Sequence, residues 1–191
     1  IAVSSIEKIE DIYRSKGKLT GVPTGFLDFD AKTAGLQKSD LILLAARPSM
    51  GKTAFALNII QNAAIRANVP TAVFSLEMSR EQLATRLISS EAFLDNKKLM
   101  TGKLSPDDWD KVTLASTALA HTKIYIDDNP SLSVADMNAK CRRIEDLGMV
   151  VIDYLQLMTS AGGSGRGGEN RQQVVSDMSR MLKIMAKELN V

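Results

Sequence analysis

The 191-residue sequence is 45% hydrophobic and 24% charged, which indicates one soluble globular domain with a sizeable core and excludes a disordered chain. Its formal net charge of +2 is too small to indicate nucleic-acid binding by itself. No apolar run approaches the roughly 18 residues of a membrane span, and the first residues lack the pattern of a secretory signal. We therefore expect a cytoplasmic protein with no membrane association.

The first residues predict a linker helix over 1–17. Ile6, Ile9 and Tyr13 recur at helical spacing, and "RSKGKLTGVPTG" then interrupts the pattern with glycine and proline. The apolar stripe has two open interpretations, since it either folds back on its own domain or docks on a neighbouring subunit. The main domain is expected over 18–191.

From residue 41 onward, short β-prone runs alternate with longer helical patterns. Strands are predicted at 41–45, 71–75, 123–127 and 149–153, and helices are predicted from about Thr53, Ser79 and Ser133 and near the end of the chain. This order predicts an α/β fold, a doubly wound and mostly parallel sheet with helices on both faces.

Several predicted helices carry recognisable signals. Ser79 with Gln82 forms a capping box, and Ser105 precedes proline and two aspartates, which favour a first helical turn. The last helix has one apolar stripe, which predicts a buried face made of Val175, Met178, Leu182, Met185 and Leu189.

The stretch "ARPSMGKT" resembles the phosphate-binding pattern G-x-x-x-x-G-K-[ST], with alanine at its first position. An apolar run precedes it and a long apolar helix follows, so the helix start directs its amides and its positive dipole at one spot. Gly51 allows phosphate to approach the backbone, Lys52 reaches phosphate oxygens, and the Thr53 hydroxyl ligates Mg²⁺. The candidate nucleotide-binding residues are Ala46, Arg47, Pro48, Ser49, Met50, Gly51, Lys52, Thr53 and Ala54.

Alanine at position 46 is compatible with this function. Alanine is costly only where φ must be positive, and the first loop position leaves a predicted strand. We therefore predict a negative φ at Ala46 and an anion-binding turn over 50–53.

Two acidic residues follow predicted strands. In a doubly wound sheet this places Asp153, after "MVVI", and Glu77, after "AVFSL", at the same edge as the loop. Asp153 has the form of a Walker B acid that holds Mg²⁺ directly or through water. Glu77 is suited to activating water. For either acid, capping the next helix is an alternative.

Other polar residues carry less chemistry. Asp127 and Asp128 in "IYIDDNP" favour a turn, and the single histidine, His121, gives no support for a histidine-based site. Cys141 lies in a helical pattern, which predicts a buried neutral thiol. The stretch 161–171 has five glycines in eight residues and is expected to be a loop.

Taken together, these segments resemble the RecA-like ATPase domain of the DnaB-type replicative helicases, a P-loop NTPase family. The resemblance rests on motifs in the family's order: "TGVPTGFLDFD", "LILLAARPSMGKTAFAL", "FSLEMSREQLATRL", "IYIDDNP", "VVIDYLQLM" and "ENRQQ".

The resemblance implies a homo-hexameric ring that hydrolyses ATP with Mg²⁺ at subunit interfaces and moves on single-stranded DNA. It implies that Lys52 and Glu77 serve catalysis and that Thr53 and Asp153 support magnesium. It also implies a primase and a helicase loader as partners. Arg166 and Arg171 lie where the family has a loop facing the DNA channel, although a simple connector is an equal alternative.

Ser39, Val174 and Asn138 depart from residues common in the family, which are glycine, glutamate and arginine. The family also continues past the position of Val191 into a γ-phosphate sensor and an arginine finger, so we expect this polypeptide to bind ATP but hydrolyse it poorly. Two other functions remain open: a RecA- or RadA-type recombinase ATPase, and a nucleotide-dependent ring-assembly module without efficient hydrolysis.

Overall fold

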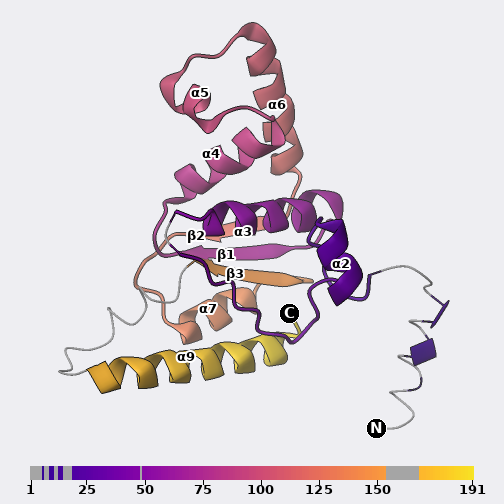
Figure 1. Ribbon diagram of the computed structural model, residues 1–191, viewed down its shortest axis with the longest axis vertical. Coiled ribbons are helices and arrows are strands. Elements are labelled where there is room, and N and C mark those ends of the chain that lie inside the picture. The colour runs from indigo at the N-terminus through magenta and orange to yellow at the C-terminus, as the bar shows by residue number, and fades with distance from the viewer. Residues whose placement is uncertain (1–5, 7–8, 11–12, 15–18, 48, 154–167) are drawn as a thin grey trace.

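The computed structural model describes residues 6, 9–10, 13–14, 19–47, 49–153 and 168–191, with the side chains of 168–173 left out. The described residues form a parallel sheet with helices packed on both faces (Figure 1). This arrangement confirms the predicted α/β class.

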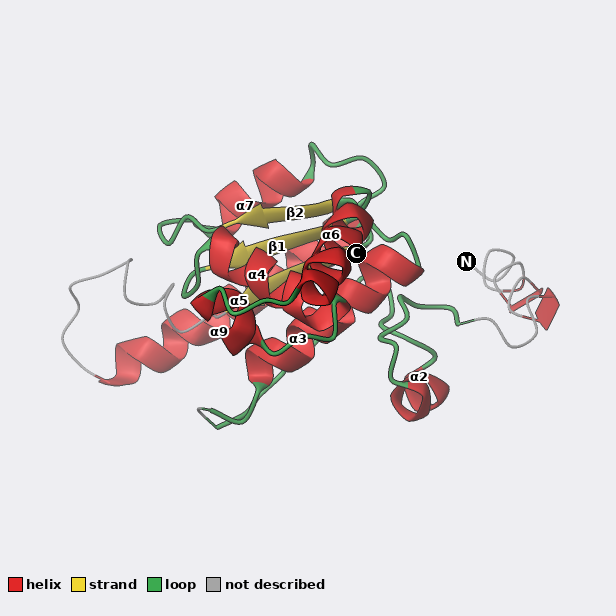
Figure 2. Ribbon diagram, turned by 90° about the horizontal axis from the view of Figure 1, so that it is seen from above, coloured by secondary structure: helices red, strands yellow, loops and turns green. Residues whose placement is uncertain are grey.

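The sheet contains β1 (Thr71–Ser75), β2 (Ile124–Asp127) and β3 (Met149–Asp153), in the order β2-β1-β3. All three strands run in the same direction, as Figure 2 shows. Ser75 pairs in register with Asp153, so β1 and β3 end together. The loops that follow β1 and β3 therefore start side by side at the carboxyl edge of the sheet.

One face of the sheet is covered by α3 (Lys52–Gln61), α4 (Arg80–Glu91) and α6 (Pro106–Ala120). A π-helical turn (Asn62–Arg66) continues α3, and α5 (Asn96–Thr101) lies at the far end of the α4–α6 arm (Figure 1). The core on this face joins alternate strand residues to apolar helix residues: Val73, Met149, Leu57, Ile60, Leu83 and Leu87.

The opposite face is covered by α7 (Val134–Cys141) and α9 (Gly168–Leu189). Met178, Leu182 and Met185 of α9 are buried, which confirms the centre of the predicted stripe, whereas Val175 is 39% exposed. Cys141 is buried in the same core as Leu182 and Met185, and this desolvation raises the pKa of its thiol to about 11. The predicted neutral thiol is thus confirmed.

Serine caps begin three of the helices. Ser79, Ser105 and Ser133 each form a capping box with the third residue of α4, α6 and α7. The first two match the sequence prediction. Asp127 accepts the amide of Asn129, which confirms its predicted turn.

The segment before α3 packs on the outside of that helix. It contains α2 (Leu27–Thr33), a bridge between Val22 and Leu36, and a ring stack between Phe26 and Phe55 with centroids 4.7 Å apart. Gly25 has φ of +84°, and a Cβ there would lie 2.1 Å from the Asn62 amide nitrogen. A larger residue here would be strained by this φ and would displace the Asn62 side chain, which donates to the Thr24 carbonyl at 3.0 Å.

The predicted strand at 41–45 is wrong in this structure. Residues 41–47 have no strand conformation, and Ile42, Leu43 and Leu44 are 51%, 65% and 45% exposed. In the described part of the chain no backbone hydrogen bond joins this segment to a strand. An apolar run becomes a strand only when a neighbouring strand pairs with it, and the sequence pattern does not specify that partner.

The loop predicted over 161–171 is wrong for residues 168–171, and residues 161–167 lie outside the described part of the chain. Residues 168–171 belong to α9, so Arg171 lies on a helix and not in a loop. The helix reaches this far because Glu169, Arg171 and the two glutamines that follow are good helix formers, and their preference outweighs the cost of Gly168 at the helix end.

Candidate nucleotide-binding site

The phosphate-loop sequence forms a turn that enters α3 directly. Positive φ angles occur at Ser49 (63°) and Gly51 (87°), and among the described residues with positive φ there is no Ala46. This agrees with the predicted negative φ at Ala46. Pro48 lies outside the described residues.

The start of α3 differs from the other helices. Gly51 occupies the N-cap position without a side-chain hydrogen bond, whereas α4, α6 and α7 have a serine oxygen at that position. A Cβ added to Gly51 would meet nothing within 4 Å, so the space above this turn is open. A helix start with a positive dipole, no capping oxygen and open space fits a phosphate group.

Lys52 and Thr53 converge on Asp153. The Lys52 Nζ lies 3.0 Å from Asp153 Oδ1, and the Thr53 hydroxyl donates to Asp153 Oδ2 at 2.9 Å. Asp153 is 8% exposed, while Lys52 and Thr53 are half-buried. Residues about 100 positions apart therefore make one polar cluster at the carboxyl end of β3, as the sequence predicts.

Glu77 lies at the same edge. It is exposed and follows the end of β1 by two residues, and the Leu76 amide donates to the Asp153 carbonyl at 2.7 Å. The turn that carries Glu77 is thus joined to the residue that contacts Lys52 and Thr53. Two residues support this turn in ways that the sequence did not predict. Ser75 bonds both backbone groups of Met78, and Asp128, which was predicted only to favour a turn, accepts the Arg80 amide at 3.1 Å. A serine at a strand end was the one available signal.

The cluster suits magnesium only together with other ligands. In the described ranges no group of three His, Cys, Asp or Glu side chains is placed to hold a metal ion. Mg²⁺ prefers six oxygen ligands and commonly binds one or two protein oxygens with phosphates and water. Asp153 and Thr53 supply oxygens of the required kind beside the open start of α3, so the residues fit a magnesium–nucleotide ligand.

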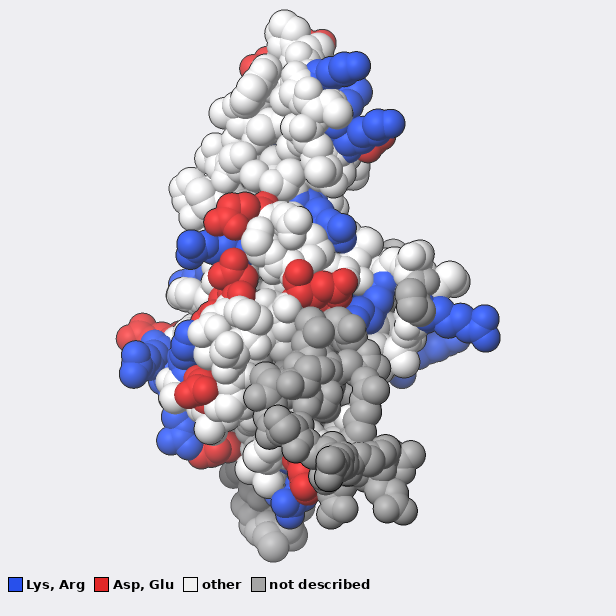
Figure 3. Space-filling model, turned by 90° about the vertical axis from the view of Figure 1, so that its left-hand side faces the viewer, with Lys and Arg blue, Asp and Glu red and all other residues white. Residues whose placement is uncertain are grey.

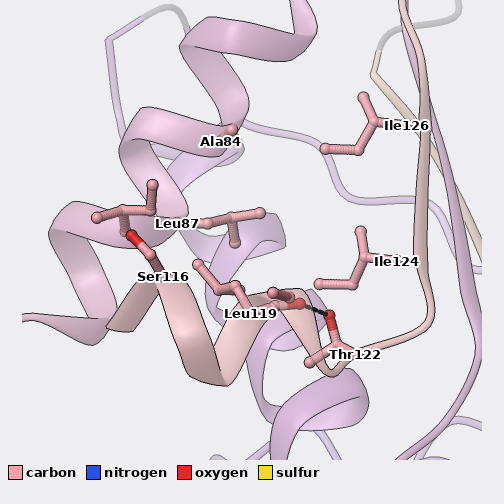
Figure 4. A pocket seen from close by; sticks show the side chains of 9 residues that line it. Ala84, Leu87, Ser116, Leu119, Thr122, Ile124 and Ile126 are labelled. Atoms are coloured by element: carbon pink, nitrogen blue, oxygen red, sulfur yellow. Dashed lines mark hydrogen bonds between the residues drawn. The ribbon is translucent and has the colours of Figure 1, made fainter. Parts of the chain in front are cut away.

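A separate hollow of about 280 Å³ lies between α4, α6 and β2, away from this cluster (Figure 4). It is lined by Ala84, Leu87, Ile88, Ser116, Leu119, Ala120, Thr122, Ile124 and Ile126. The Thr122 hydroxyl donates to the Leu119 carbonyl at 2.6 Å and is thereby satisfied. Because these nine lining residues include no charged side chain, this hollow does not suit a triphosphate.

Charges of both signs are interspersed on the side of the molecule drawn in Figure 3. Among the residues coloured there, Lys and Arg do not form a continuous basic track. Arg166 lies outside the described residues, and the side chain of Arg171 is not described.

Comparison with known sequences and structures assigns the family. The model of the DnaB-like helicase C terminal domain matches residues 21–191. The chain belongs to this family. It is 53% identical over its whole length to the replicative DNA helicase DnaB of Geobacillus stearothermophilus and 50% identical to the replicative DNA helicase DnaC of Bacillus subtilis, and it spans 42% of each.

Solved structures agree with this assignment. One solved ATPase domain superposes with a TM-score of 0.87 at 33% identity, covering all of this chain and 68% of that one. A DnaB-like replicative helicase whose structure addresses its interactions with primase gives a TM-score of 0.84 at 33% identity, with 46% of its chain covered. The fold is therefore that of the helicase ATPase domains. No helix in the described part of the chain is long and apolar enough to cross a membrane.

Proposed function

We propose that this chain is the ATP-hydrolysing motor domain of a replicative DNA helicase. The observation that carries the proposal is the convergence of Lys52 and Thr53 on Asp153 at the uncapped start of α3. Membership of the DnaB-like helicase family supports the same function.

Each residue has a distinct role in the proposed reaction. The loop residues 46–54 surround the phosphates of ATP, and Lys52 neutralises charge on the β- and γ-phosphate oxygens. The Thr53 hydroxyl and the Asp153 carboxylate hold Mg²⁺, with Asp153 acting directly or through water. When bound, this ion neutralises the charge that develops on the phosphates. Glu77 accepts a proton from the attacking water.

The proposal extends to the assembled protein. Residues 1–17 act as a linker helix whose apolar stripe docks on an adjacent subunit of a homo-hexamer, which would cover side chains of Ile6, Ile9 and Tyr13 that are 57%, 64% and 71% exposed. Single-stranded DNA passes through the ring near Arg166 and Arg171, and primase and a helicase loader bind the intact protein.

Replacing Glu77 by glutamine in the intact protein tests the proposal. We expect turnover to fall at least ~100-fold while nucleotide affinity stays within about twofold, because only the water-activating group is lost. Glu81→Gln is the matched control, since Glu81 is exposed on the next helix and pairs with Arg80. Unchanged turnover in Glu77→Gln would instead indicate a ring-assembly module. Failure to displace a strand from a forked DNA substrate would favour a recombinase.

A further inference from the structure

Ser75 closes the turn that carries Glu77. This residue ends β1 and is 1% exposed. Its hydroxyl donates to the Met78 carbonyl at 2.7 Å and accepts the Met78 amide at 3.1 Å. One buried side chain therefore holds both backbone polar groups of the residue that follows Glu77.

The residue before Glu77 is held as well. The Leu76 amide donates to the Asp153 carbonyl at 2.7 Å, which ties this side of the turn to β3. Glu77 itself is exposed, so packing does little to fix its position. The place of its backbone relative to Asp153 and Lys52 is thus set by the bonds at Leu76 and Met78.

We infer that Ser75 is a positioning residue for the Glu77 carboxylate. This inference rests on the proposed role of Glu77 in activating water. A water-activating carboxylate must lie within hydrogen-bond reach of the attacking water, and a displacement of about 1 Å can cost roughly 100-fold in rate. Without the Ser75 hydroxyl, Met78 loses the hydrogen bonds of both its backbone polar groups, and the Glu77 carboxylate samples a wider range of positions.

The test is Ser75→Ala in the intact protein, with kcat, KM for ATP and nucleotide affinity measured separately. We expect kcat to fall about tenfold or more, with KM and affinity within about twofold, because the phosphate-contacting residues are unchanged. Ser89→Ala is the matched control. Ser89 is also buried, and its hydroxyl donates to a backbone carbonyl, that of Leu94, at 2.7 Å.

A double substitution separates positioning from general destabilisation. In the Glu77→Gln background, Ser75→Ala should cause no further loss of kcat, since Ser75 acts through Glu77. Ser75→Cys, of similar volume but with weaker hydrogen bonding, provides a second variant should the alanine variant unfold.

The outcomes distinguish the two hypotheses. Unchanged turnover in Glu77→Gln refutes the proposed function. A large effect of Glu77→Gln combined with equal kcat values for Ser75→Ala and Ser89→Ala refutes only the role of Ser75. A further loss in the double variant also refutes it.

Discussion

Replacing Asp153 by asparagine measures how strongly this residue competes with phosphate for Lys52. In the structure, Asp153 Oδ1 lies 3.0 Å from Lys52 Nζ, the group that is proposed to bind phosphate. Nucleotide binding therefore requires the ammonium to exchange a carboxylate for a phosphate. Asparagine has nearly the same shape and retains an oxygen for the Thr53 hydroxyl, so the substitution removes the charge with little change in packing.

The magnitude follows from distance and exposure. Opposite unit charges about 4 Å apart attract by ~1 kcal/mol in water and ~4 kcal/mol at an effective dielectric constant of 20. Lys52 is 27% exposed and the Asp153 side chain 12%, so solvent screens the pair in part. We take ~1–2 kcal/mol as the cost of separating them. Asp153→Asn should thus bind ADP about 5- to 30-fold more tightly when Mg²⁺ is removed by EDTA.

The assay is fluorescence anisotropy with a labelled ADP, in EDTA and in Mg²⁺. Magnesium should strengthen binding to the unsubstituted protein and have much less effect on Asp153→Asn, which lacks the carboxylate that is proposed to hold the ion. Asp127→Asn is the matched control, since Asp127 also ends a strand and pairs with a lysine, Lys140. Its affinity in EDTA should stay unchanged.

A second comparison isolates the ion pair. Removing the Asp153 charge also reduces its repulsion of the ADP phosphates, which tightens binding in the same direction. In the Lys52→Ala background only this repulsion remains, so Asp153→Asn should have a smaller effect there. Equal effects in both backgrounds, or no tightening in EDTA, would show that Asp153 does not compete for Lys52.

Three other substitutions have definite expected outcomes. Gly51→Ala should lower the free energy of unfolding by only about 1 kcal/mol, because the φ of +87° disfavours alanine but the added Cβ meets no atom within 4 Å. The affinity for ADP should fall at least ~10-fold, because the methyl group would occupy the space proposed for phosphate. An unchanged ADP affinity in a titration would contradict this. Ser39→Gly should raise the free energy of unfolding by ~0.5–1 kcal/mol in denaturant titrations, because Ser39 has a φ of +67°, which glycine adopts without strain. As a control, Ser116→Gly in the middle of α6 should lower the free energy of unfolding by about 1 kcal/mol, because glycine disfavours a helix interior. Asp108 accepts the Ser105 amide and pairs with Lys98, which lowers the pKa of its carboxyl group. The ionised carboxylate of Asp108 therefore stabilises the folded state fully at pH values above its unfolded-state pKa of about 4. This stabilisation is lost as the pH falls through the lower pKa of the folded state. Asp108→Asn should therefore reduce the decline in melting temperature over that pH range.

Local signals in the sequence predicted much of the fold. The strand 71–75 and the strand 149–153 form at the predicted bounds, because each is a short β-prone run between helical patterns. The serine caps of α4 and α6 depend on contacts within four residues and were readable for the same reason. The segment 41–45 was equally apolar, yet its strand depends on a partner far away in the chain, which no local pattern describes.

The departure at Ser39 shows how a structure can explain a sequence difference. The resemblance to the family marks glycine as usual at this position, and the φ of +67° is one that glycine adopts without strain. Two hydrogen bonds hold Ser39 there: its backbone amide donates to the Val191 carbonyl at 2.8 Å, and Lys183 donates to the Ser39 carbonyl at 2.8 Å. The backbone strain is thus offset by contacts with the end of α9.

The convergence at the carboxyl edge depends on strand parity as much as on strand ends. Met149 and Val151 pack on the α3 side of the sheet, whereas Val150 and Ile152 pack on the α7 and α9 side. Because side chains alternate along a strand, Asp153 falls on the α3 side and meets Lys52 and Thr53. A carboxylate at position 152 would end the same strand and satisfy the same sequence pattern, yet it would face the other layer. The candidate site therefore requires the acid at a position of β3 whose side chain faces α3, as those of residues 149 and 151 do. This condition becomes visible only once the faces of the sheet are assigned.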